Sequence, residues 1–391
     1  MDLENAATPL AWPGTIKRLL WMQGLMNASQ FMTVPLLALY MSAQLRFDAL
    51  ALASVMSANL LCAQILPLAA GALADRMCSH RLITTGLCLR GLGLAGFCTF
   101  SSEQAWVVSA MLAGTGMACY EGGVYALLGR QPKASLSRVF ASNNQMLNVG
   151  AASGALLGGL AGAFDARLAF ALSGAMFVLL GLLSIFAADE SPLPFNTRSA
   201  RQSLGAAASQ RELWRLVLVA LPWFFLFPQL YVAFPMYAGK LAGPYGASAI
   251  YVVNGVAGLV FLTLVKRWLV SARPAPLVTG GYALAGIAFA SVSLIHGIGG
   301  FLLFIVVYTV IETVLLPTFE SMTAALAPEG SQGTFFGVLS AVGALGGGAG
   351  YYVGSWLLLN RSGAETWLSF GAVGLVGCLM SALLLRARPS S

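Results

Sequence analysis

The chain has 391 residues, of which 58% are hydrophobic and only 9% charged, and its mean hydropathy is +0.80. Soluble globular proteins carry about 25% charged residues, so this composition excludes an ordinary water-soluble enzyme. The 21 Lys and Arg outnumber the 14 Asp and Glu and give a net charge of +7. The basic residues are divided between loops rather than gathered in one patch, so we expect no nucleic-acid partner.

Stretches of about 20 apolar residues, long enough to cross a bilayer as a helix, recur along the whole chain. They predict an all-α integral membrane protein with twelve spans. In chain order, the spans cover residues 16–43, 48–73, 81–100, 105–130, 137–163, 166–188, 212–239, 245–268, 275–295, 298–327, 332–358 and 364–386.

The loops between these spans differ in charge. With twelve spans, 16 of the 21 basic residues lie in one set of loops, four lie in the other set, and Arg90 lies inside a span. Cytoplasmic loops carry the excess of Lys and Arg. The sequence therefore predicts that both termini are cytoplasmic.

The sequence divides into two halves of six spans. The polar segment Asp189–Arg211 contains SPLPFNTRSARQ and is typical of a linker. We therefore expect one six-helix bundle over 1–188, a cytoplasmic linker over 189–211 and a second bundle over 212–391.

The two halves also resemble each other. Four pairs of residues are separated by 196 positions: Phe140 and Phe336, Gly150 and Gly346, Gly154 and Gly350, and Gly158 and Gly354. Gly86 and Gly280 have similar surroundings at an offset of 194. Two such repeats are typical of a transporter whose site lies between the halves near the middle of the membrane.

No cofactor or metal is expected. Five of the six cysteines lie in apolar runs and none forms a CxxC pair, so they are typical of buried apolar residues. The sequence GLGLAG at 91–96 matches GxGxxG, but it lies within a span and follows no strand.

The loop after the second span, residues 71–81, reads GALADRMCSHR. It resembles the signature loop G-x-L-A-D-R-x-G-R-K of the major facilitator superfamily. The matching residues are Gly71, Leu73, Ala74, Asp75 and Arg76. It departs from that pattern at Cys78, Ser79 and His80. The resemblance implies a loop that holds the cytoplasmic side closed in one conformation.

Two further motifs narrow the resemblance. Span five resembles the antiporter motif G-x-x-x-G-P-x-x-G-G, with Ala155 in place of proline. The matching glycines are Gly150, Gly154, Gly158 and Gly159. In span three, TTGLCLRG ends near Arg90 and resembles one bacterial branch of proton-linked multidrug exporters. This resemblance implies a monomer in the inner membrane.

Four ionisable residues lie inside predicted spans, where a charge is costly and therefore indicates function. They are Arg90, Glu121, Glu312 and Glu320. Arg90 and Glu121 each lie nine residues from the cytoplasmic end of their spans, about 13 Å deep. They form either a structural ion pair or a proton-coupling site. Glu312 is the second candidate for proton coupling, and Glu320 is a candidate gate residue.

Polar and aromatic stripes mark candidate cavity walls. Span one carries Gln23, Asn27 and Gln30 on one face, and span five adds Asn144 and Asn148. These amides either line a water-filled path or join helices. Span seven carries three prolines and an aromatic stripe that faces either lipid or an amphiphilic substrate. Its candidate residues are Trp223, Phe227 and Tyr231.

Together these patterns predict a secondary transporter that exports a small amphiphilic molecule in exchange for protons. Its expected partners are that substrate, protons and the lipid bilayer. A siderophore or sugar exporter of the same fold remains an alternative. A membrane-embedded enzyme is disfavoured because the sequence has no H-E-x-x-H or G-x-S-x-G motif, and a passive channel is a further alternative.

Overall fold

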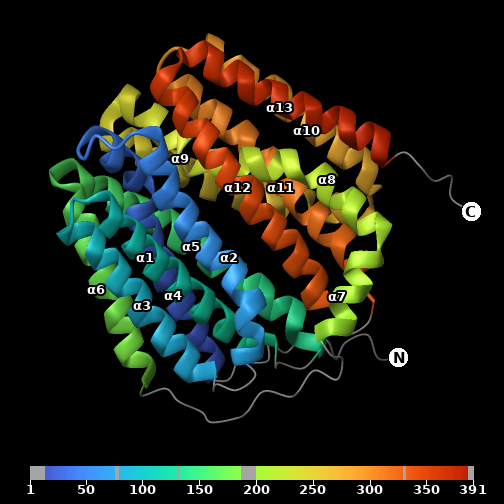
Figure 1. Cartoon of the computed structure of the whole chain (residues 1–391), viewed down its shortest axis with the longest axis horizontal. Coiled ribbons are helices and arrows are strands. Elements are labelled where there is room, and N and C mark those ends of the chain that lie inside the picture. Colours follow the sequence, from blue (N-terminus) through green and yellow to red (C-terminus); the bar gives the residue numbers. More distant parts are fainter. Residues whose placement is uncertain (1–13, 75–78, 130–132, 186–199, 329–331, 386–391) are drawn as a thin grey trace, which may run out of the picture.

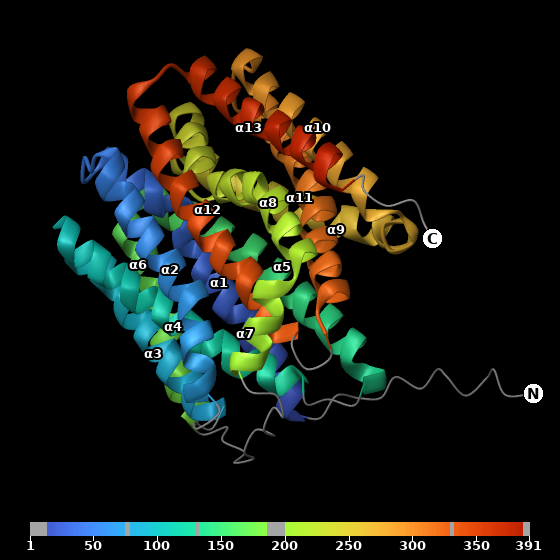
Figure 2. The same cartoon turned by 45° about the vertical axis from the view of Figure 1, so that its right-hand side comes forward.

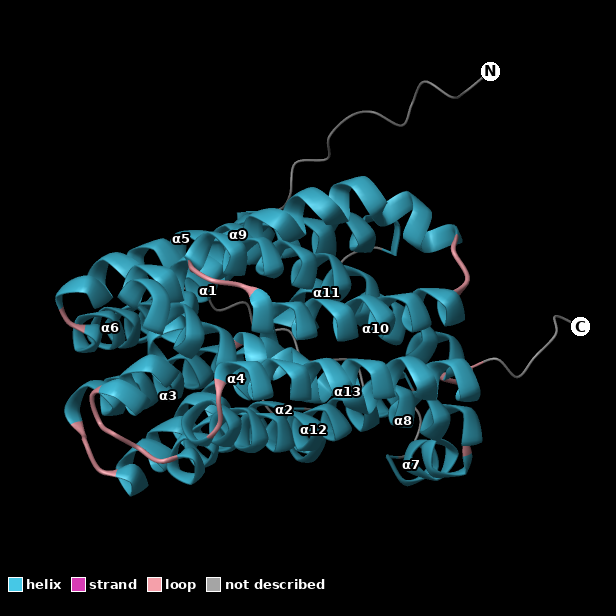
Figure 3. Ribbon diagram, turned by 90° about the horizontal axis from the view of Figure 1, so that it is seen from above, coloured by secondary structure: helices cyan, strands magenta, loops and turns pink. Residues whose placement is uncertain are grey.

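The structure is a computed structural model, which describes residues 14–74, 79–129, 133–185, 200–328 and 332–385. Within these ranges the protein consists of helices and short connections, without strands (Figure 3). Gly71 lies in helix α2 (Ala49–Ala74), but the structure does not describe its packing. Asp75 and Arg76 of the signature loop lie outside the described residues.

The first half contains six long helices. They are α1 (Gly14–Ala43), α2 (Ala49–Ala74), α3 (Ser79–Thr99), α4 (Glu103–Gly129), α5 (Lys133–Phe164) and α6 (Ala166–Ile185). Each of these helices covers one predicted span, with ends that differ from the prediction by a few residues.

The second half has more irregular helices. They are α8 (Arg211–Leu226), the 3₁₀ turn η1 (Phe227–Leu230), α9 (Ala233–Ser271), α10 (Pro274–Ser291), η2 (Val292–Leu294), α11 (Ile298–Leu326), α12 (Gln332–Asn360) and α13 (Gly363–Leu384). Helix α9 is interrupted at Ala242 and Gly243, and Gly243 has a φ of 61° that favours glycine. This interruption separates the predicted seventh and eighth spans.

Twelve passes through the membrane follow from these helices. Nine stretches of the described residues are long and apolar enough to cross a bilayer, and one of them, Arg211–Phe261, contains 51 residues and the break at Gly243. This stretch is therefore two passes. Helices α1 and α4 are less apolar, but their 30 and 27 residues are long enough to cross. The predicted all-α membrane fold is confirmed.

A short helix, α7 (Ala200–Ser209), lies in the segment predicted to be only a linker. Ala207 of this helix is buried in a small cluster with Leu213 of α8 and Phe335 of α12. The linker therefore folds locally because its alanine-rich end packs on the second half.

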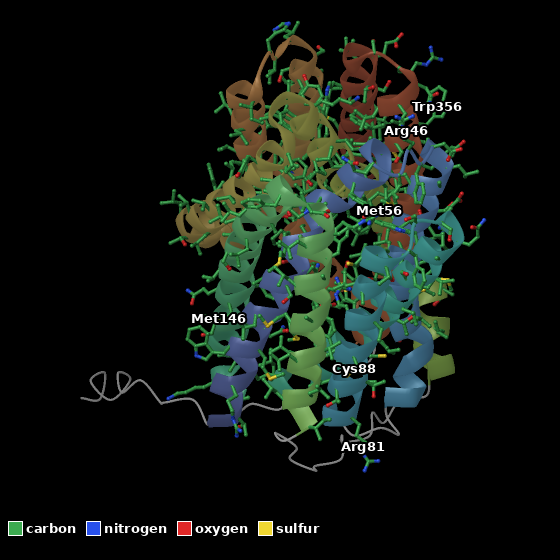
Figure 4. All side chains as sticks on the ribbon, turned by 90° about the vertical axis from the view of Figure 1, so that its left-hand side faces the viewer. Arg46, Met56, Arg81, Cys88, Met146 and Trp356 are labelled. Atoms are coloured by element: carbon green, nitrogen blue, oxygen red, sulfur yellow. The ribbon has the colours of Figure 1, made fainter. Side chains whose placement is uncertain are left out.

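The two halves lie side by side as two bundles (Figures 1 and 2). Contacts between α2 and α12, and between α5 and α9, join them. Large apolar side chains such as Leu264, Leu303 and Leu383 are exposed, as expected of a lipid-facing surface. Figure 4 shows Arg81 at one end of the bundle and Arg46 at the opposite end, as the alternation of loops predicts.

Equivalent glycines make equivalent contacts in the two halves. Gly154 of α5 packs against the backbone of Ala28 in α1, and Gly350 of α12 packs against Phe225 in α8. The fifth helix of each half therefore contacts the first. The pair at an offset of 194 is not structurally equivalent. Gly86 packs on the next helix, but Gly280 has open space around it. The residue that packs on the next helix in the second half is Gly281.

Candidate functional site

A cavity of about 440 Å³ lies between the two bundles. Its wall includes Gln30 of α1, Asn59 of α2 and Arg90 of α3 from the first half. The second half contributes an aromatic wall formed by Phe224, Phe227, Tyr231, Phe319, Phe336 and Tyr351. A cavity of this volume, apolar with a few polar groups, is typical of a small-molecule site.

Cross-half contacts lie on both sides of the cavity along the bundle. Ser340 of α12 donates a hydrogen bond to the side-chain oxygen of Gln64 in α2, at 3.0 Å. Toward the other end of the bundle, Gly239 of α9 packs on Leu39 of α1. The halves would have to separate at one of these contacts before a substrate could enter from that side.

Arg90 is a buried cation on the cavity wall. Its Nη1 donates to the carbonyl oxygen of Ala113 at 3.0 Å, and its Cζ lies 5.3 Å from the ring centre of Phe177. Among the described residues, no carboxylate forms an ion pair with it and its Nε has no hydrogen-bond partner. Glu121 lies near enough for its charge to attract Arg90, but the expected direct ion pair is not formed in this structure.

Two partly buried acids, one in each half, lie within electrostatic range of the same tyrosine. Glu312 of α11 accepts a hydrogen bond of 2.9 Å from the amide of Asn254 in α9, which also donates to Thr309. Both Glu312 and Glu121 lie near enough to Tyr231 for their charges to act on its hydroxyl group. Tyr231 lines the cavity, so both acids lie within electrostatic range of a residue on the cavity wall.

Glu320 occupies a different position from the other acids. It is exposed, and it lines the cavity from the second half. It forms no ion pair with a described residue. Among the described lining residues, one carboxylate and one guanidinium group therefore lie on walls that belong to opposite halves.

The amide stripe of span one divides between two roles. Gln23 is buried and donates to the side-chain oxygen of Asn143 at 3.1 Å, while Asn27 donates to the backbone carbonyl of Leu147. These two amides join α1 to α5 and are not among the cavity-lining residues, whereas Gln30 is. The side chain of Asn144 lies outside the described part of the chain.

Two other candidates for the cavity wall contact neighbouring helices instead. Trp223 is buried and stacks on Tyr308 at 5.8 Å between ring centres. Asn148 is partly buried on α5, and its backbone oxygen approaches Gly255 of α9. Neither residue is among those that line the cavity.

The break in span seven places Phe227 and Tyr231 at the cavity. Three side chains satisfy carbonyl groups at the break: Tyr308 donates to Phe227 at 3.2 Å, Tyr251 donates to Leu230 at 2.7 Å, and Gln229 donates to Phe225 at 3.0 Å. Because Pro228 cannot donate a backbone hydrogen bond, the helix opens there. The bend turns aromatic side chains toward the first half.

The glycines of the antiporter-type motif pack against two partners. Gly150, Gly154 and Gly158 contact α1, where a Cβ would collide with backbone carbonyl oxygens. Gly159 faces Ser248 of α9, which belongs to the other half. The motif therefore holds α5 against its own half and also shapes its contact with the second.

Several wall residues were not among the predicted site residues. The polar ones are Thr33, Asn59, Gln64 and Ser340. Isolated polar residues on apolar helices give little signal in a sequence, because most such residues make a hydrogen bond within the bundle.

The comparisons with known proteins decide the family. The sequence pattern described as Major Facilitator Superfamily matches residues 19–351. The chain belongs to the Major Facilitator Superfamily. The resemblance seen in the sequence is thus confirmed, and the protein is a multi-pass membrane transporter of this superfamily.

Relatives of this superfamily member include proteins named multidrug resistance protein MdtH. The one from Enterobacter sp. (strain 638) is 25% identical over 88% of this chain and 88% of its own length. The one from Shigella dysenteriae serotype 1 is 24% identical over 89% of this chain and 87% of its own.

Solved structures of two other transporters share the fold. The nucleoside transporter NupG, as a mutant, has a TM-score of 0.80 and 14% identity, over 95% of this chain and 100% of that one. A bacterial homologue of the human lysosomal transporter Spinster, inward-facing and unoccupied, has a TM-score of 0.79 and 13% identity, over 97% of this chain and all of the other.

Proposed function

We propose that this protein exports a small amphiphilic molecule across the inner membrane in exchange for protons, with both termini in the cytoplasm. The two halves rock about the cavity and expose it to each side in turn. The observation that carries this proposal is the cavity itself, because its wall is shared by both halves and combines aromatic surfaces with polar groups. The names of the MdtH relatives agree with such a substrate.

Glu121 is the first candidate for the proton-coupling acid. It lies in the first half, near the charge of Arg90 and near Tyr231 on the cavity wall. Protonation would remove its attraction for Arg90 and so change the charge beside the cavity. A substrate and a proton could then bind in alternation, as exchange requires.

Glu312 is the second candidate. It shares with Glu121 the approach to Tyr231, but its hydrogen bond to Asn254 already holds the carboxylate in place. Asn254 and Glu312 belong to adjacent helices of the second half. A proton on Glu312 would therefore act first on the contact between α9 and α11.

Flux measurements in proteoliposomes test the proposal. We expect purified protein to accumulate a fluorescent amphiphile when a pH gradient is imposed, and a protonophore to abolish the accumulation. Glu121→Gln mimics the protonated acid, so it should lose proton-driven accumulation but keep substrate-for-substrate exchange. Glu212→Gln, a change in an exposed ion pair with Arg215, is the control.

Equal accumulation of the amphiphile with and without a pH gradient would contradict proton exchange. Normal uphill transport by Glu121→Gln would instead remove this residue from the coupling role. Glu312→Gln would then be the variant expected to lose proton-driven accumulation.

A further inference from the structure

The charges on the cavity wall have an unusual distribution. Among its described lining residues, only Arg90 and Glu320 belong to the residue types that are ordinarily charged at neutral pH, and they lie in opposite halves of the molecule. Neither forms an ion pair with a described residue. A wall with one free base and one free acid is suited to a ligand that carries both charges.

The Arg90 side chain has an unused hydrogen-bond donor and makes no direct ion pair with a described carboxylate. The residue is only 5% exposed, yet its Nε has no hydrogen-bond partner among the described residues. Its Nη1 bond to Ala113 is made to a neutral carbonyl. A buried cation with an unused donor is costly unless a carboxylate or similar anion completes it.

Glu320 has no cationic partner among the described residues. Glu320 is an exposed residue that lines the cavity, and Phe319 and Phe336 line the same cavity. Aromatic faces and a carboxylate together favour a protonated amine attached to an apolar body.

We propose that the transported molecule is an aromatic zwitterion, with its anionic group at Arg90 and its protonated amine at Glu320. This inference rests on the proposed export function and names the substrate class of the same cavity. The cavity volume of about 440 Å³ suits a ligand of drug-like size. Each half of the protein recognises one charge of the ligand, so a bound zwitterion bridges the halves.

A matched set of probes tests the charge pattern. The zwitterion is 4′-(aminomethyl)biphenyl-4-carboxylic acid, its methyl ester lacks the negative charge, and its N-acetyl derivative lacks the positive charge. We expect proton-driven transport of the zwitterion to exceed that of either derivative about tenfold, as the loss of one charge-assisted contact implies. Binding is followed separately as the rise in thermal unfolding temperature of the purified protein.

Variants assign each charge to its residue. Glu320→Gln should lose the preference over the N-acetyl probe and keep the preference over the ester. Arg90→Gln should show the opposite pattern, while Arg90→Lys keeps the charge and most of the preference. Glu212→Gln is the control outside the cavity. If Arg90→Gln does not fold, Glu320→Gln alone still tests the proposal, because its side chain is exposed.

The outcomes separate this inference from the proposed function. Proton-driven transport of all three probes at similar rates would overturn the zwitterion and leave proton exchange in place. Absence of both binding and transport of the zwitterion would also overturn it. Selective binding of the zwitterion, with transport that ignores the proton gradient, would support the inference and overturn proton exchange instead.

Discussion

At the scale of single residues, the contact between α1 and α5 depends on the absence of side chains. Gly150, Gly154 and Gly158 lie so close to α1 that a Cβ on any of them would meet a backbone carbonyl oxygen. A carbonyl in a helix cannot move aside as a flexible side chain can. Substitution at these positions must therefore push the helices apart.

Gly154→Ala should destabilise the protein, because its new Cβ would collide with the carbonyl of Ala28. We expect a loss of about 1–3 kcal/mol in unfolding free energy, the usual cost of overpacking, seen as a lower unfolding temperature in detergent. The matched control is Gly280→Ala, which enters open space in another helix. Equal unfolding temperatures for the two variants would contradict the contact.

Residue patterns predicted which side chains face inward, but not what each one touches. Gln23, Asn27 and Gln30 recur on one face of α1, yet the first two bond to α5 and the third lines the cavity. One face of a helix is wide enough to meet several neighbours, so periodicity alone cannot separate these roles. Equal depth likewise placed Arg90 near Glu121 without deciding whether they touch.

At the scale of helices, hydrogen bonds from distant parts of the chain stabilise the break in span seven at η1. Tyr251 and Tyr308 both donate to carbonyl groups at the break, and Gln229 donates to Gly350 of α12 at 2.9 Å as well as to Phe225. The break is therefore a fixed feature with satisfied carbonyl groups rather than a frayed helix.

Tyr251→Phe should destabilise the protein at this break, because the carbonyl oxygen of Leu230 would lose the hydrogen bond that the Tyr251 hydroxyl donates. We expect a cost of about 1–3 kcal/mol in unfolding free energy and slower transport. Tyr352→Phe is the control, since that side chain is exposed on α12. Unfolding temperatures can be compared in detergent, and an unchanged value for Tyr251→Phe would contradict a structural role.

The sequence predicted the long helices well because each required an apolar run of membrane length. The prolines of span seven also predicted a bend, but not its form, since the stabilising hydroxyl groups come from other helices. Helix α7 was missed because its short alanine-rich sequence has no span signal. Its burial depends on Phe335, more than a hundred residues away.

At the scale of the whole molecule, contacts between the halves lie on both sides of the cavity. The hydrogen bond between Ser340 and Gln64 and the contact of Gly239 with Leu39 belong to different helix pairs. Alternating access would require these contacts to open one at a time. This requirement can be tested by fixing one of them.

A cross-link between α2 and α12 should stop transport. In a cysteine-free background, Gln64→Cys and Ser340→Cys together should be joined by a short disulfide-containing bis-maleimide, because the side chains that they replace meet in the structure. We expect flux in proteoliposomes to fall to background after cross-linking and to return with reductant. Ser340→Cys alone is the control. Full transport by the linked protein would show that this contact does not need to open.

Two exposed glycines, which the predicted topology places on opposite sides of the membrane, test the orientation of the protein in the membrane. Gly205 of α7 and Gly363 at the start of α13 both have open space for a side chain. In the cysteine-free background, Gly205→Cys should resist an impermeant thiol reagent in intact cells, whereas Gly363→Cys should react. The reverse pattern would invert the topology expected from the 16 basic residues of one loop set.

The division of the cavity wall between the halves has a consequence for release. A pocket formed within one rigid bundle keeps its shape when that bundle moves, so a tightly held ligand would need a separate step to escape. Here Arg90 and Tyr231 belong to different bundles, and any rotation of one bundle changes the distance between them. If the halves rock as proposed, affinity would fall as the pathway opens, and the movement that admits solvent would also release the substrate.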